Sequence, residues 1–223
     1  MDIICSKSKK INAHNVCRTL NWKLIFSLLF MVHLFACQSP PKNADIISAK
    51  FDTQNVNINL YWKDQNGKLL NNIGNLNQHL TQQEKTLIFA ANGGMFDTSF
   101  NPIGLFIENG IEQKSINTLI IKDTLKTIPN FYLQPNGIFY ITADEDPGIC
   151  TTQNYPSHIS MKCATQSGPM LLVNGEINPI FKPKSTNLYI RNGVGILPNK
   201  ELIFAMSKNE INFWNSRFIG IIK

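Results

Sequence analysis

The sequence is poor in charge and contains no long run of charged residues. Charged residues make up 16% of the 223 residues, against about a quarter in an average globular protein. Because 43% of the chain is apolar, it has ample material for a hydrophobic core, and wholesale disorder is excluded. The composition also excludes collagen-like, coiled-coil and multi-span membrane proteins.

A basic patch of the kind that binds nucleic acids is also missing. The net charge is +6, but residues 1–36 contain five basic residues and only one acidic residue. The rest of the chain therefore carries a net charge of only +2, and its lysines and arginines are scattered. Nucleic-acid binding needs such residues clustered on the folded domain, so no nucleic-acid partner is expected.

The N-terminus is typical of an export signal. A basic stretch precedes the apolar residues 24–35, which would span about 18 Å as a helix, too short for a bilayer core of about 30 Å. The sequence LFAC ends at Cys37 and resembles a bacterial lipoprotein signal, in which this cysteine is lipidated; the alternative is an ordinary secretory signal. We therefore expect a signal peptide at 1–36, a tether at 37–44 and a lipid-anchored domain at 45–223, facing the periplasm from a membrane of the cell envelope.

Few cysteines remain after such a signal. Cys150 and Cys163 would be exported into a compartment that permits disulfides, so we predict a bridge between them. Its loop would stabilise the fold by about 3 kcal/mol. Because only His158 lies nearby and zinc takes four ligands, no metal site is predicted, and no cofactor is assigned.

The rest of the chain has the signature of β-hairpins. Asn-Gly pairs at 66–67, 109–110, 136–137 and 174–175 lie between apolar or β-branched runs, a pattern that predicts hairpin turns. The apolar runs 86–91 and 202–206 are predicted as buried strands, and 75–84 as an amphipathic helix capped by Asn75, with Leu76 and Leu80 on one face. The predicted fold is β-rich α+β, with mixed sheets and few helices in a single domain.

Three segments call for an explanation beyond hairpins. Asn92-Gly93-Gly94 follows a predicted buried strand, and paired glycines there let backbone N–H groups converge on a ligand; the alternative is a sharp structural turn. Gln166-Ser167-Gly168 offers an amide and a hydroxyl in one irregular turn, but no nucleophile elbow surrounds the serine. Arg191-Asn192 follows apolar strand residues; its guanidinium suits a phosphate or carboxylate, or else an internal salt bridge to Glu108 or another acid.

Together these segments resemble the phosphodiester glycosidase family, whose members include the enzyme that removes N-acetylglucosamine from a phosphodiester on lysosomal glycoproteins, and in particular its short bacterial lipoprotein-like relatives. The matching stretches, in chain order, are FAANGGMFDTSFNPIGLFIENG (89–110), FYLQPNGIFYIT (131–142), ATQSGPMLLVNGEINP (164–179) and YIRNGVGILPNKELIFAMS (189–207). The resemblance implies hydrolysis of a sugar-1-phosphate diester, with a glycan or sugar phosphate as ligand. By position it implies a substrate site formed by Asn92, Gly93, Gly94, Gln166, Ser167, Gly168, Arg191 and Asn192, with Arg191 holding the phosphodiester.

Such a reaction calls for a carboxylate that activates water or acts as the nucleophile. Glu108 and Asp97 are the acids nearest the matching motifs and are the predicted catalytic residues; the alternative for Glu108, just before the Asn109-Gly110 turn, is an exposed hairpin residue. Residues 144–146 are interpreted as a solvated acidic loop.

The sequence also departs from the family pattern at its C-terminal end. Members continue into a helix and a strand with an Asp-Gly motif, whereas no aspartate follows Asp146 here. We expect the C-terminal part of the domain to be missing. The alternatives to an enzyme are a non-catalytic envelope lipoprotein that binds a glycan or a protein, and an inactive truncated product.

Overall fold

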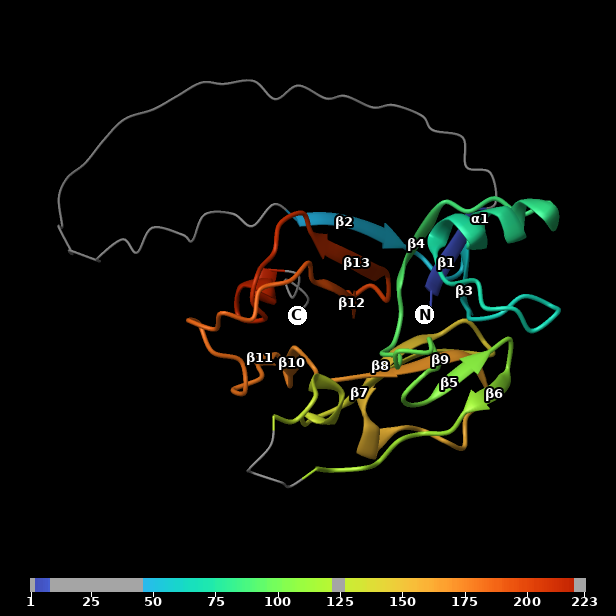
Figure 1. Ribbon diagram of the computed structural model, residues 1–223. Helices are drawn as coiled ribbons and strands as arrows, with labels where there is room; N and C mark the ends of the chain where they lie inside the picture. Colours follow the sequence, from blue (N-terminus) through green and yellow to red (C-terminus); the bar gives the residue numbers. More distant parts are fainter. Residues whose placement is uncertain (1–2, 9–45, 122–126, 219–223) are drawn as a thin grey trace, which may run out of the picture.

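Three antiparallel sheets surround a shared apolar core. The computed structural model describes residues 3–8, 46–121 and 127–218, and all strand pairs in these ranges are antiparallel. Figure 1 shows a five-stranded sheet lying below two three-stranded sheets. Short 3-10 helices occur at η1 (Asn130–Tyr132), η2 (Thr152–Asn154) and η3 (Asn215–Phe218).

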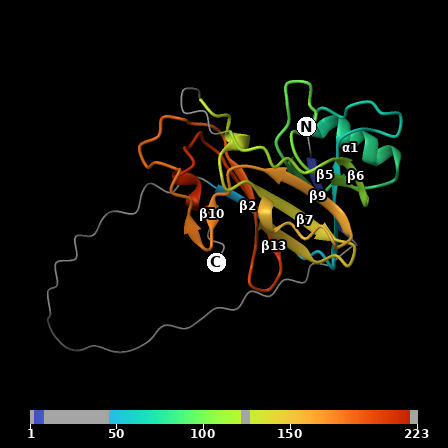
Figure 2. The same cartoon turned by 90° about the horizontal axis from the view of Figure 1, so that it is seen from below.

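The five-stranded sheet has the order β6-β5-β9-β7-β8. Its strands are β5 (Phe106–Glu108), β6 (Ile111–Lys114), β7 (Gly137–Thr142), β8 (Pro147–Thr151) and β9 (Met161–Ser167). The central strand β9 pairs with β5 on one side and β7 on the other, and Figure 2 shows β9 and β7 side by side. One face of this sheet packs into the shared core; the other carries a separate apolar cluster that includes Leu105, Ile107 and Ile138.

A second sheet, of order β12-β13-β2, brings the two ends of the domain together. It consists of β2 (Ile46–Phe51), β12 (Asn192–Ile196) and β13 (Leu202–Ser207). A small hairpin, β10 (Leu172–Val173) and β11 (Glu176–Ile177), lies outside the three larger sheets.

The third sheet is a split βαβ unit, in which a strand from the N-terminus of the chain lies between the two strands of the unit. Strand β3 (Val56–Tyr61) leads through helix α1 (Ile73–Gln82) to β4 (Phe89–Asn92). Strand β1 (Ile3–Ser8) lies between β3 and β4 and is antiparallel to both. Consequently β3 and β4 run parallel to each other, with α1 as the crossover.

The shared core is formed by the inner faces of the sheets. Alternate residues of β3, together with Phe106, Phe139 and Phe204 from other strands, are buried there. Helix α1 covers a smaller cluster in which Leu76 and Leu80 are buried. These two leucines confirm the predicted apolar face of the helix.

The helix begins earlier than predicted. Asn72, and not Asn75, is its N-cap, because Asn72 has extended backbone angles and its side chain accepts a hydrogen bond from the Asn75 N–H at 2.9 Å. The side chain of Asn75 instead donates to the Leu70 carbonyl. The predicted cap was therefore wrong by one turn.

Of the four predicted hairpin turns, the one at 136–137 is wrong. Asn109-Gly110 and Asn174-Gly175 have positive φ at both residues and join β5 to β6 and β10 to β11. Gly67 also has positive φ, in the turn closed by the Lys63–Leu69 bridge. Asn136 is buried, and its side chain donates to the Phe131 carbonyl and accepts from Thr152; this binds it to the loop before β7.

The fold is β-rich with one α-helix in a single domain, so only the coarse fold class is confirmed. The predicted mixed sheets are wrong, because every strand pair in the described ranges is antiparallel. The run 202–206 is indeed a strand, whereas residues 89–91 of the other run are only half-buried. No described helix is long and apolar enough to cross a membrane; residues 9–45, with the predicted apolar signal and Cys37, lie outside the described ranges.

Candidate active site

The three singled-out segments meet at one place in the fold. The Asn192 side chain, at the start of β12, donates to the Asn92 carbonyl at 3.2 Å, where β4 ends. The Met95 N–H, just after the Gly93-Gly94 bend, donates to the Gln166 carbonyl near the end of β9 at 3.4 Å. We call this meeting place the junction and define its exposed part as Asn92, Ser167 and Asn192.

Gln166 does not lie on the surface of the junction. It belongs to the buried residues that hold the surrounding loops in place, which we call the frame of the junction. Its side chain is 1% exposed, and its Oε1 accepts from the N–H groups of Leu105 and Asn117, both at 2.9 Å. Its Nε2 donates to the Asn117 carbonyl at 2.7 Å and to the Thr152 hydroxyl at 3.1 Å. With its hydrogen-bonding groups occupied in this way, the side chain positions the loops around the junction and has no capacity left for a ligand.

Two glycines permit this close packing. A Cβ on Gly104 would lie 2.2 Å from the Oε1 atom of Gln166, which is far inside contact distance. A Cβ on Gly168 would lie 2.4 Å from the Asn136 Nδ2 atom and 2.8 Å from the Phe131 carbonyl oxygen. Gly168 is therefore required by packing against the buried Asn136.

Arg191 lies beside the junction, but its guanidinium is held by the residues that surround it. Its Nε donates to the Ile211 carbonyl at 3.3 Å, and one terminal nitrogen donates to the carbonyl and the side chain of Asn187. The guanidinium carbon lies 3.7 Å from the centre of the Phe213 ring, a cation–π contact. Partial burial lowers the pKa of this guanidinium, which still carries its positive charge.

The charge of Arg191 is not neutralised by a carboxylate of the described ranges. The alternative of an internal salt bridge is therefore not realised there. The hydrogen bonds and ring contacts of the guanidinium go to residues of the 187–213 region and not to the bends at Asn92–Gly94 or Ser167–Gly168. The sequence thus predicted the neighbourhood of Arg191 but not the direction of its side chain.

The carboxylate of Asp97 accepts hydrogen bonds from residues of its own loop. Its Oδ1 accepts from the N–H groups of Ser99 and Asn101, and the Asn101 side chain donates to both carboxylate oxygens. These hydrogen bonds, those of Asn101 foremost, lower the pKa of Asp97, so it is ionised at neutral pH. The carboxylate closes the loop that follows the Gly-Gly bend.

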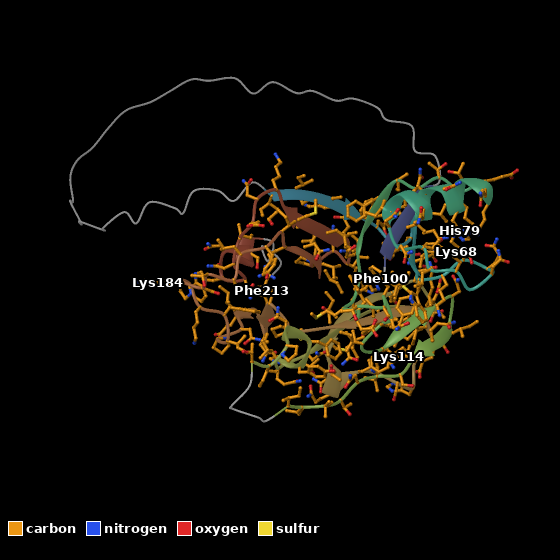
Figure 3. The ribbon with its side chains drawn as sticks, viewed as in Figure 1. Lys68, His79, Phe100, Lys114, Lys184 and Phe213 are labelled. Atoms are coloured by element: carbon orange, nitrogen blue, oxygen red, sulfur yellow. The ribbon has the colours of Figure 1, made fainter. Side chains whose placement is uncertain are left out.

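Asp97 also lines a pocket of about 640 Å³. The pocket is lined by aromatic, amide and charged residues, namely Trp62, Asp97, Asn101, Pro102, Ile103, Gln113, Lys114, Asn117 and Tyr132. Figure 3 shows Lys114 far from Phe213, the ring on which Arg191 rests. The pocket and the Arg191 region are therefore separate parts of the surface.

Glu108 lies away from the junction. It ends β5 next to the Asn109-Gly110 turn and pairs with Ile111 in the hairpin. Leu105, whose N–H contacts Gln166, lies three residues earlier, which is about 10 Å along an extended strand. The two acids predicted as catalytic are therefore not brought together at the junction.

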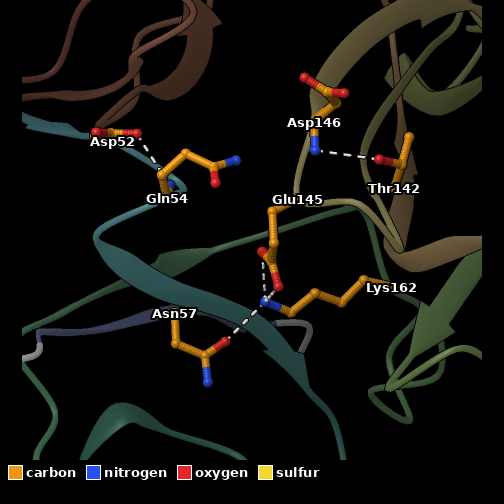
Figure 4. Close-up of polar contacts among 7 residues, drawn as sticks. All are labelled: Asp52, Gln54, Asn57, Thr142, Glu145, Asp146 and Lys162. Atoms are coloured by element: carbon orange, nitrogen blue, oxygen red, sulfur yellow. Dashed lines mark hydrogen bonds and ion pairs between the residues drawn. The ribbon is translucent and has the colours of Figure 1, made fainter.

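An ionic link that the sequence did not reveal lies at the opposite end of β9. The Lys162 Nζ atom lies 2.7 Å from Glu145 Oε1 and also donates to the Asn57 side chain at 2.8 Å (Figure 4). The link joins β9 to β3 and to the turn between β7 and β8. Glu145, interpreted as part of a solvated loop, is thus half-buried and paired, whereas Asp144 and Asp146 are exposed.

The predicted disulfide is not formed. Cys150 and Cys163 are both free thiols, on β8 and β9, and β7 separates these two strands. Cys163 is buried in the shared core, while Cys150 packs against the cluster on the other face of the sheet. Side chains on opposite faces of non-adjacent strands cannot be bridged.

Comparison with known proteins assigns the family. The family model described as phosphodiester glycosidase (NAGPA) matches residues 85–216, which include all three segments of the junction. This chain belongs to the phosphodiester glycosidase family. It is also 32% identical over 202 residues to the uncharacterized protein YigE of Escherichia coli (strain K12), covering 88% of this chain and 76% of YigE. No solved structure matches.

Within the described ranges, no group of three or more His, Cys, Asp or Glu residues could hold a metal ion.

Two residues that support the junction, Asn117 and Asn136, were missed in the sequence analysis; each is hydrogen-bonded to backbone or side-chain groups beside it. A buried asparagine that supports loops leaves no periodic signal in a sequence.

Proposed function

We propose that this protein hydrolyses a sugar-1-phosphate diester at its glycosidic carbon, in the bacterial cell envelope, while anchored by lipid at Cys37. Family membership supports the reaction class. The predicted export signal and the cysteine at its end support the location. The observation that carries the proposal is that the three segments shared with the family meet at one junction, through Asn192 to Asn92 and Met95 to Gln166.

The junction offers donors and a nearby positive charge. The exposed side chains of Asn92, Ser167 and Asn192 suit the hydroxyl groups of a sugar, and Gly93 lets a ligand approach the backbone. The charge of Arg191, held against Phe213, favours an anionic phosphodiester close by.

The proposed reaction needs little help from a general acid. Water attacks the anomeric carbon, the bond from that carbon to the phosphate oxygen breaks, and the phosphate monoester leaves with the bonding electrons. Because that leaving group is already a stable anion, it needs little protonation. Asp97 is ionised and follows the bend by three residues, so it is the acid nearest the bend in sequence that could accept the proton of the water, although its lowered pKa makes it a weak base.

One observation favours the non-catalytic alternative, a lipoprotein that binds a glycan. Both oxygens of Asp97 already accept hydrogen bonds within its loop, and Glu108 lies at the far end of β5. A junction without a free carboxylate could bind a saccharide ester without cleaving it.

Turnover of a chromogenic glycosyl phosphodiester tests the function. We expect release of sugar by the wild-type protein and a loss of at least tenfold in kcat/KM for Arg191→Ala and Ser167→Ala. Lys184→Ala is the matched control, because Lys184 is an exposed cation on the same side of the molecule as Phe213, the ring that Arg191 contacts (Figure 3), and no described contact joins it to the junction. Saturable binding without turnover would favour the binding alternative, and neither binding nor turnover would refute both.

The location has its own test. Cys37→Ser should release the protein from the membrane fraction of cells and abolish incorporation of labelled fatty acid. Incorporation that persists in Cys37→Ser would refute the anchor without affecting the proposed reaction.

A further inference from the structure

The split βαβ unit leaves a space one strand wide between β3 and β4. Their backbones lie two strand spacings apart, or about 9.6 Å, because β1 pairs with both. Within the described ranges neither β3 nor β4 has another strand partner. Without β1, both strands would therefore present a row of unpaired N–H and C=O groups to the same space.

Parts of the chain other than β1 hold this space open. Helix α1 spans it, since Leu76 and Leu80 belong to one cluster with Tyr61 of β3 and Ala90 of β4. On the inner side, alternate residues of β3 and Phe89 of β4 pack in the shared core. The two walls are thus fixed by the helix and the core, whichever strand lies between them.

The sequence of β1 matches this space imperfectly. On the core face, β3 contributes Val56, Ile58 and Leu60, all buried. The residues of β1 in register with them are Ser8, Ser6 and Ile4. Apolar residues at these register positions would extend the apolar face of β3, whereas two of the three are serines.

We propose that the space between β3 and β4 is an acceptor for an added β-strand. In the full-length chain it holds residues 3–8, and after their removal it takes up an extended peptide of another protein. That peptide runs antiparallel to β3 and β4 and has apolar residues at alternate positions, as in recognition by β-strand addition. Signal cleavage before Cys37 would remove residues 3–8, so the exported protein would present the acceptor open. This inference rests on the proposed signal cleavage at Cys37 and not on the proposed hydrolysis.

The acceptor adjoins the junction. Asn92, which receives the hydrogen bond of Asn192, is in register with Ile3 at the end of β4. A strand bound in the acceptor therefore pairs with the residue that opens the Gly-Gly bend, and it would hold that bend in place.

Cross-linking of the full-length chain tests the first half of the proposal. Cys5 is directly opposite Asn59 on β3 and Ala90 on β4, and such pairs have Cα atoms about 4.5–5.5 Å apart, within disulfide range. Under mild oxidation, Asn59→Cys and Ala90→Cys should each form a disulfide with Cys5, detected by peptide mass spectrometry. Asn57→Cys, two positions out of register, is the control. Failure of both variants, or equal cross-linking of the control, would overturn the proposal.

Strand exchange tests the second half. A protease site placed within residues 9–45 of the full-length chain is cut after folding, and a biotinylated peptide of residues 3–8 carrying S6I and S8V is added. We expect at least tenfold more of this peptide bound than of the same peptide with C5P, which lacks a backbone donor in mid-strand. Equal binding of the two peptides, or binding of neither, would overturn the acceptor.

Discussion

The amide of Asn192 reaches the carbonyl of Asn92 across 100 positions of sequence, at 3.2 Å, and fastens the start of β12 to the end of β4. This bond joins two of the three segments that the chain shares with its family. Both residues are exposed, so the bond shapes the surface more than it stabilises the fold.

For Asn192→Ala, the free energy of unfolding should fall by only about 0.5–1 kcal/mol, because the lost hydrogen bond is exposed. If the junction binds substrate, the same variant should raise KM or the ligand Kd several-fold. Urea denaturation and the glycosyl phosphodiester assay measure the two effects. A variant with unchanged substrate affinity would remove Asn192 from the site.

For Gln166→Leu, the free energy of unfolding should fall by about 3 kcal/mol or more. The substitution leaves the buried N–H groups beside the Gln166 amide without their acceptor. Gln153→Leu, at an exposed position, should change stability by no more than about 0.5 kcal/mol. Equal effects of the two substitutions in urea denaturation would contradict the framing role of Gln166.

The two ion pairs of the β7–β8 turn should differ in strength. In the Lys162–Glu145 pair the side chains are 17% and 35% exposed, whereas in Lys200–Asp146 they are 75% and 56% exposed. Double-mutant cycles with Met for lysine and the amide for each acid should give a coupling of about 1 kcal/mol for the first pair and close to zero for the second. A stronger coupling in the exposed pair would contradict the geometry.

Cys163 should make the protein less stable at alkaline pH. Burial raises the pKa of its thiol from 9.0 to about 12. Below pH 9 the thiol is protonated in both states; between pH 9 and about 12 the unfolded chain has released the proton that the folded protein still holds. The unfolded state then binds fewer protons, so the free energy of unfolding falls as pH rises, by at most about 1.4 kcal/mol per pH unit.

Cys163→Ala isolates this effect from that of the tyrosines Tyr140 and Tyr155, whose pKa values are also raised by burial. The variant should show a shallower loss of stability between pH 9 and 12 than the wild type, measured by urea denaturation at each pH. In the folded wild type, maleimide should modify Cys150 before Cys163, because only Cys150 is partly accessible. Equal rates of modification would contradict the buried position of Cys163.

Local chemistry in the sequence predicted much of the fold. The turns at 109–110 and 174–175 followed from the tolerance of Asn-Gly for positive φ, and the buried face of α1 followed from the spacing of Leu76 and Leu80. The turn at 136–137 failed because Asn136 bonds to Phe131 and Thr152, a tertiary contact that overrides the local preference. The disulfide failed because strand order, which sets the distance between Cys150 and Cys163, is a long-range property.

The sequence indicated which segments would meet, but not the directions of their side chains. The segments around Asn92, Gln166 and Asn192 meet as the resemblance implied. However, no local pattern indicates that the Gln166 amide faces inward or that the Arg191 guanidinium rests on Phe213. Both orientations depend on residues tens of positions away, so they emerge only when the sheets are assembled.

The central position of β9 constrains how the length of this protein can vary. The strand is paired on both sides; Lys162 near one end pairs with Glu145, and Gln166 near the other builds the frame of the junction. Inserting or deleting one residue within 161–167 would turn every later side chain of the strand to the opposite face. Homologues should therefore differ in length in the exposed connection around 157–160, and β9 itself should keep a constant number of residues.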